Sequence, residues 1–133
     1  MKIKLIILVL SLGLASFAYG QQGEEISTID FVQILDGNDE EAVFYYQKNW
    51  KVLREMALKK KYIKSFQLLK TEASEEAPFQ IMLITNYANA KQYSKREKYF
   101  AKIIKAKGEL DLLNDKKPAE FRKVVFGKEA FGY

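Results

Sequence analysis

The side chains that could do chemistry in this chain are carboxylates, amines, guanidinium groups and hydroxyls, because its 133 residues include no histidine and no cysteine. Ser-His and Cys-His nucleophile pairs, thiolate chemistry, and imidazole or thiolate metal sites are therefore excluded. Any proton transfer would fall to Asp, Glu, Lys, Tyr or Arg. Asp30 is the single carboxylate within the predicted strands, and it would be a candidate catalytic base if it were buried.

A metal site built from oxygen ligands alone has one candidate position. Asp36, Asn38 and Glu40 have the one-three-five spacing of a calcium loop, but Glu41 occupies the position that requires glycine and Gln47 the position that requires glutamate. The same residues are better interpreted as a helix start, with Asn38 as N-cap and Glu41 completing a capping box. We expect no metal and no cofactor.

Aromatic residues make up 14% of the chain, and most of them are expected to pack in a core or a dimer interface. A cavity lined by such rings would suit a flat apolar ligand. The best candidates for cavity contacts are Asn49, Trp50 and Arg54 on a predicted helix and Tyr87 at a strand end. No catalytic motif accompanies them, so the sequence favours a non-enzymatic role.

The first 20 residues have the pattern of a cleavable signal peptide. Lys2 and Lys4 precede an apolar run from 5 to 18, and Ala18-Tyr19-Gly20 gives a small-x-small cleavage site. The alternative is an uncleaved anchor, but the run is shorter than the roughly 20 residues that span a bilayer. We therefore expect cleavage after Gly20, a secreted or periplasmic protein without stable membrane insertion, and one domain over residues 21–133, ordered from about residue 25.

The hydrophobic periodicity of the mature chain alternates between strand and helix. It predicts a strand at 26–35, a helix at 38–60, strands at 62–71 and 79–87 that pair antiparallel around a loop at 72–78, and a helix from Asn86 or Asn89 to Lys107 that Gly108 ends. Residues 109–133 are less regular. A closing strand at 122–126 is favoured there over a short helix at 118–126. The order is that of the α+β ferredoxin-like β-α-β-β-α-β arrangement, an antiparallel sheet with two helices on one face.

Three segments of the chain carry a family resemblance. Trp50-Lys51-Val52-Leu53, the strand at 62–68 and the strand at 79–87 are similar to those of small exported proteins related to the NIPSNAP and antibiotic-biosynthesis-monooxygenase groups. The resemblance implies a dimeric α/β barrel, hence a homodimer with a cavity between sheet and helix in each subunit. It does not imply an activity. Its haem-degrading members depend on an iron-ligating histidine, which this chain lacks.

The strand at 79–87 supports dimerisation independently, because both of its faces are apolar. Ile81 and Leu83 lie on one face and Met82 and Ile84 on the other. A sheet with helices on one side should be polar on its free side. We therefore expect the second face to be buried between two copies.

Three functions remain open from the sequence. The first is a non-enzymatic homodimer that binds a small hydrophobic ligand or an envelope partner. The second is a cofactor-free oxygenase or isomerase that acts on a flat aromatic substrate, and the third is a purely structural role. Nucleic-acid binding is not expected despite a net charge of +5, because no recognition motif is present and export removes the usual partners.

Overall fold

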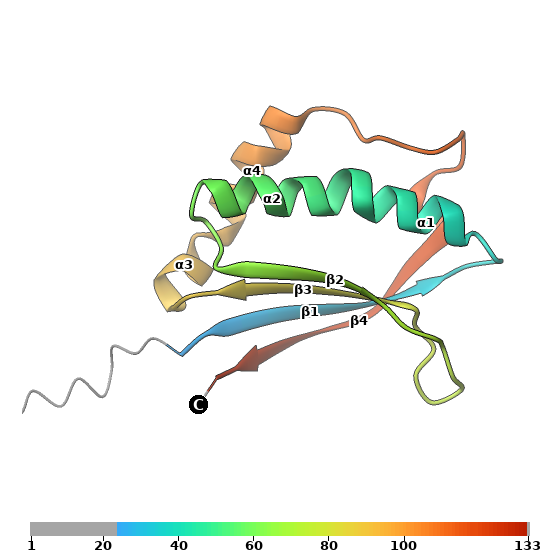
Figure 1. Ribbon diagram of the computed structural model, residues 1–133, viewed down its shortest axis with the longest axis horizontal. Helices are drawn as coiled ribbons and strands as arrows, with labels where there is room; N and C mark the ends of the chain where they lie inside the picture. Colours follow the sequence, from blue (N-terminus) through green and yellow to red (C-terminus); the bar gives the residue numbers. More distant parts are fainter. Residues whose placement is uncertain (1–23, 133) are drawn as a thin grey trace, which may run out of the picture.

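The chain folds as an α+β domain around one open, four-stranded antiparallel sheet. The structure, a computed structural model, describes residues 24–132, so the predicted signal peptide lies outside the described residues. The strands are β1 (Ile26–Ile34), β2 (Ser65–Lys70), β3 (Ile81–Tyr87) and β4 (Arg122–Phe131), in the spatial order β2-β3-β1-β4. Figure 1 shows the helices on one side of this sheet and, in the described part of the chain, none on the other.

The predicted helix at 38–60 is present as three consecutive pieces, namely α1 (Asp39–Tyr45), a π-helical turn η1 (Tyr46–Trp50) and α2 (Lys51–Lys59). The predicted capping box is wrong. The Asn38 side chain makes no cap hydrogen bond; its amide donates to the Leu35 carbonyl at 2.8 Å, and its Oδ1 accepts from Lys116 Nζ at 2.6 Å. The preceding Leu35 and the distant Lys116 thus occupy the Asn38 side chain in place of the helix amides.

The second predicted helix is confirmed as α3 (Ala90–Ser94) and α4 (Arg96–Lys107), which are separated at Lys95. Asn89 caps α3 by accepting a hydrogen bond from the Gln92 amide at 2.8 Å. Gly108 follows α4 with φ at +86°, a backbone conformation that glycine adopts without steric cost.

Both predicted alternatives, a short helix and a closing strand, are present at the end of the chain, one after the other. A single helical turn, α5 (Pro118–Phe121), leads into the closing strand β4, which is longer than the predicted 122–126. β4 pairs antiparallel with β1, with a bulge between Phe31 and Val32. The Leu35 amide donates to the Phe121 carbonyl at 3.0 Å, which fixes α5 beside the end of β1.

The core lies between the sheet and the helices. One cluster of buried side chains packs under α1 and another under α2 and α4, and together they contain Val32, Ile34, Ala42, Tyr46, Ile81, Leu83, Phe121, Ala57, Ile63, Tyr87 and Ile103. On β1 the buried residues are Ile26, Val32 and Ile34. The face with Ile29 and Phe31, the more uniformly apolar one in sequence, is therefore the side that carries no helix. Alternation separates the two faces of a strand but does not say which is covered.

The helix-facing side of the sheet is open toward the β4 edge. Val124 is 46% exposed and Phe131 58% exposed, and Glu129 and Gly127 are also exposed. In the described part of the chain, α1 and α2 instead pack above β2 and β3, and α4 packs against α2 (Figure 1). Side chains of β1, the strand between β3 and β4, therefore border an open region.

Candidate functional site

Arg54 lies at the centre of a cluster of side chains between α2 and the sheet. Its guanidinium carbon is 4.4 Å from the centre of the Trp50 ring and 4.2 Å from that of the Phe100 ring on α4. Its Nε donates a hydrogen bond to Thr85 Oγ1 on β3 at 3.0 Å. Two aromatic rings and one hydroxyl thus fix the position of a cation above the sheet.

The Arg54 guanidinium remains charged although it is largely removed from water. Burial lowers its pKa to about 10, and the nearby Tyr87 and Asp30 oppose that effect. Its only hydrogen bond within residues 24–132 is the one to Thr85, and no carboxylate there forms an ion pair with it. A partly buried cation without a counterion is unusual, because the desolvation cost is normally offset by pairing.

Asp30 is the carboxylate that interacts electrostatically with Arg54. Its side chain extends from the helix-facing side of β1 toward β4. A Cβ atom added to Gly127, its neighbour on β4, would lie 2.7 Å from Asp30 Oδ1. The glycine therefore leaves room for the carboxylate over β4, whereas Arg54 is anchored over β3 on the other side of β1. Burial raises the pKa of Asp30, and the Arg54 charge partly offsets that rise.

Two tyrosines, Tyr87 and Tyr46, border the same region. Tyr87 is 2% exposed and meets the Tyr93 ring edge-on, with ring centres 5.3 Å apart. Burial raises the pKa of Tyr87 and of Tyr46, with nearby arginines acting in the opposite direction. Both phenols therefore stay protonated at neutral pH and act as neutral hydrogen-bonding groups.

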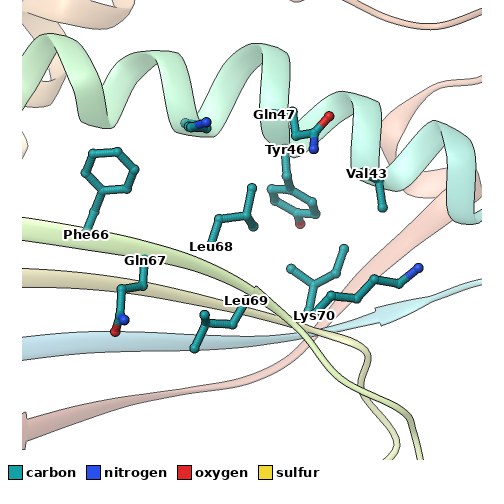
Figure 2. Close-up of a pocket in the computed structure, with 10 residues that line it drawn as sticks. Val43, Tyr46, Gln47, Phe66, Gln67, Leu68, Leu69 and Lys70 are labelled. Atoms are coloured by element: carbon teal, nitrogen blue, oxygen red, sulfur yellow. The ribbon is translucent and has the colours of Figure 1, made fainter.

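A separate pocket of about 320 Å³ lies between β2 and the first helix. Figure 2 shows Val43 and Tyr46 extending from the helix toward Phe66 and Leu68, which extend from β2 toward the helix. The remaining lining residues are Gln47, Lys51, Gln67, Leu69, Lys70 and Ile81. The two lysines form only exposed ion pairs, Lys51 with Glu55 at 3.8 Å and Lys70 with Asp39 at 3.4 Å.

The uncovered face, by which we mean the helix-free side of the sheet, carries an apolar row across all four strands. Leu69, Met82, Phe31 and Phe126 are consecutive cross-strand neighbours. The Phe31 ring lies 4.7 Å from Phe79 and 4.5 Å from Phe126. Leu69 and Phe126 are 40% and 42% exposed, so the row is solvent-accessible in one copy of the chain.

Farther along the uncovered face, the apolar row gives way to a polar one. Asn86 accepts a hydrogen bond from the Ser27 hydroxyl and donates one to Ser65 Oγ at 2.9 Å. These side chains satisfy one another across β1, β3 and β2. The uncovered face is thus divided into a polar end and an apolar end.

Four of the five predicted site residues meet around one point. The Trp50 ring contacts the Arg54 guanidinium, and Tyr87 and Asp30 interact electrostatically with its charge. Asn49 lies elsewhere: it is 3% exposed and bonds the backbone of Tyr45 and Asp111 and the Lys107 amine, a structural role. None of the five lines the 320 Å³ pocket.

Sequence reasoning missed Thr85, Phe100 and Tyr46 as parts of these sites. A signal for Thr85 was present, since it is the one aliphatic hydroxyl among the buried positions of β3, between Leu83 and Tyr87. Phe100 had no such signal, because its contact with Arg54 depends on how α4 packs against α2.

The described residues contain no group of three or more acidic side chains that could hold a metal ion. Within residues 24–132, no helix is both long and apolar enough to cross a membrane. Comparison of the chain with family models, curated proteins and solved structures finds no match.

Proposed function

We propose that this chain is an exported, homodimeric, non-enzymatic module that binds a small apolar molecule. The observation that carries the proposal is the 320 Å³ pocket between β2 and the first helix, because Val43, Phe66, Leu68 and Ile81 give it an apolar lining. Ligand sites are typically cavities of about 300–1,000 Å³ with a few polar groups, and this one is at the small end of that range.

The size of the pocket limits the ligand. Liquid water occupies about 30 Å³ per molecule, so the pocket holds a molecule of about ten non-hydrogen atoms. The polar groups at its lining are Gln47, Lys51 and Lys70, together with the hydroxyl of Tyr46. A short apolar molecule with one polar end fits that lining best.

The proposed fold class is the ferredoxin-like dimeric α/β barrel, as in the NIPSNAP-related and antibiotic-biosynthesis-monooxygenase groups. The element order and the strand order β2-β3-β1-β4 support it. In the proposed homodimer, the apolar row of the uncovered face packs against its copy in a second subunit. That packing would remove the exposed parts of Leu69 and Phe126 from water.

Native mass spectrometry of the protein purified from its own cells tests these points together. We expect a chain that begins at Gln21, a two-chain mass, and additional mass from a retained small molecule. The Leu68→Trp variant should fill the pocket and lose the retained mass while remaining dimeric. Leu58→Trp is the matched control, because Leu58 is an exposed leucine of α2 outside the pocket. A single-chain species without bound mass would refute the proposal.

A second function, a cofactor-free oxygenase or isomerase, is favoured by one observation at the Arg54 cluster. Asp30 has a raised pKa and lies within the electrostatic field of a fixed cation, which is an arrangement suited to a base beside a group that stabilises negative charge. If the chain is an oxygenase, the retained molecule incubated with the protein should gain the mass of oxygen in air but not under argon. If the chain is an isomerase, the molecule should change its chromatographic retention under both gases without a change in mass. Asp30→Asn should abolish that change, and an unchanged molecule under both conditions would exclude this function.

A further inference from the structure

The Arg54 guanidinium has hydrogen-bonding capacity that the described chain leaves unused. Nε is occupied by Thr85, whereas the N–H groups on Nη1 and Nη2 bond no acceptor within residues 24–132. The guanidinium carbon lies over the rings of both Trp50 and Phe100. The two Nη atoms are therefore the part of the group that remains available to a new partner.

The chain's own carboxylates do not serve as that partner. Asp30 interacts with Arg54 electrostatically but forms no ion pair with it, and its carboxylate is directed over Gly127 on β4. The second acid of this surface is Glu129, on the helix-facing side of β4, and it accepts a hydrogen bond from Tyr93. Both acids of this surface are thus turned to other neighbours, and the cation has no counterion among residues 24–132.

We propose that Arg54 is the anion-binding residue of a second ligand site, which takes the carboxylate of a small aromatic monocarboxylic acid. A guanidinium fixed in its plane presents two parallel N–H donors, which match the two oxygens of a carboxylate. The partly exposed rings of Trp50 and Phe100 beside it favour an aromatic body. The negative charge of Asp30 disfavours a second anionic group on the ligand.

The site is accessible and is distinct from the 320 Å³ pocket. Arg54 and Asp30 are both partly exposed, and they border the open helix-facing side near β4, where Phe131 is 58% exposed. Arg54, Asp30 and Thr85 are absent from the lining of the pocket. Binding at Arg54 therefore goes beyond the function proposed above and can fail or succeed independently of it.

Trp50 reports directly on this site, because it is the only tryptophan of the chain and its ring stacks on the guanidinium. The experiment titrates the protein purified from its own cells with benzoate and follows Trp50 fluorescence. Benzamide, which has the same ring and shape without the charge, is the matched control ligand. We expect a saturable change with benzoate and a change at least about tenfold weaker with benzamide, since hydrogen bonds to charged groups are about twice as strong as neutral ones.

Variants assign the response to one residue. Arg54→Met should reduce benzoate affinity at least about tenfold, and Thr85→Val, which removes the acceptor that fixes Nε, should reduce it several-fold. Arg96→Met is the matched control and should leave affinity unchanged, because Arg96 also stacks on a ring, that of Tyr93, but donates from Nη1 to a backbone carbonyl. If Arg54→Met does not fold, Arg54→Lys replaces it and should still lose most of the affinity, because an ammonium has no planar fork.

Three results would overturn the inference. The first is a fluorescence response that does not saturate with benzoate. The second is equal binding of benzoate and benzamide, which would indicate an apolar contact rather than a charged one. The third is a folded Arg54 variant that binds as well as the unaltered protein.

Discussion

The close approach of Asp30 to Gly127 makes the substitution Gly127→Ala a sharp test of where the Asp30 carboxylate lies. The alanine Cβ would be 2.7 Å from Asp30 Oδ1, whereas ordinary van der Waals contact begins at 3.4 Å. The carboxylate must therefore move by several tenths of an ångström. Displacing a side chain from its rotamer costs on the order of 0.5–1.5 kcal/mol.

The same substitution also has a favourable part. Gly127 is in the extended strand β4 and its φ is not in the left-handed region, so alanine fits the backbone. Replacing glycine where the conformation is compatible stabilises a protein by about 0.4–1 kcal/mol through the unfolded chain. The net effect with Asp30 present should therefore lie between about 0.5 kcal/mol of stabilisation and about 1 kcal/mol of destabilisation.

A double-mutant cycle separates the two parts. With Asp30→Ala in the background, the steric conflict is absent, and Gly127→Ala should stabilise by about 0.4–1 kcal/mol, which gives a coupling of about 1 kcal/mol between the positions. Urea unfolding at a fixed protein concentration, followed by Trp50 fluorescence, measures all four proteins. Gly132→Ala is the control, because a Cβ there meets its nearest neighbours at 3.9 Å and should not couple to Asp30. Coupling below about 0.3 kcal/mol would show that the carboxylate does not lie over Gly127.

Three further predictions concern stability and association. Asn49→Ala should lower the free energy of unfolding, measured in urea, by about 3 kcal/mol, because it leaves buried backbone partners unpaired. Asn114→Ala on the exposed loop is the control and should cost little. Equal costs would contradict the structural role of Asn49. Asp30→Asn should gain stability relative to the unaltered protein as the pH rises above about 4, the unfolded-state pKa of aspartate. Because the folded-state pKa is raised, ionisation of Asp30 destabilises the folded state as pH rises, and a pH-independent difference would refute the burial of its charge. Met82→Glu should convert a homodimer to single chains, because a carboxylate would enter the apolar row. Sedimentation measures the change, and circular dichroism should stay the same. A persistent dimer would place the interface elsewhere.

The order of elements could be predicted from the sequence because each has its own period. The alternation at 79–87 and the three-and-four spacing at 38–60 are local signals, and the antiparallel pairing of β2 with β3 follows from their short connection. The covered side of β1 could not be predicted in the same way. It depends on where the helices pack, and both faces of that strand carry apolar residues.

The candidate site was predictable in part of its members but not in its arrangement. Trp50 and Arg54 are four residues apart on one helix, so their proximity follows from helical geometry. The hydrogen bond from Arg54 to Thr85 and the direction of Asp30 over Gly127 depend on tertiary packing between distant segments. The role of Asn49 also depends on a distant segment, because only the structure shows that its side-chain amide forms hydrogen bonds with the backbone of Asp111.

The π-helical turn at 46–50 has a consequence for how the chain tolerates changes in length. A π turn holds one residue more than an α turn, and each residue of an α-helix rotates the following side chains by about 100°. Deleting a single residue from this turn would allow a continuous α-helix, and the rest of α2 would keep its direction relative to α1, because the turn would still close after one full rotation. Closing the turn to α geometry with all of its residues present would instead rotate Arg54 by about 100° away from Thr85, so the π turn absorbs a surplus residue and keeps both halves of the helix facing the sheet.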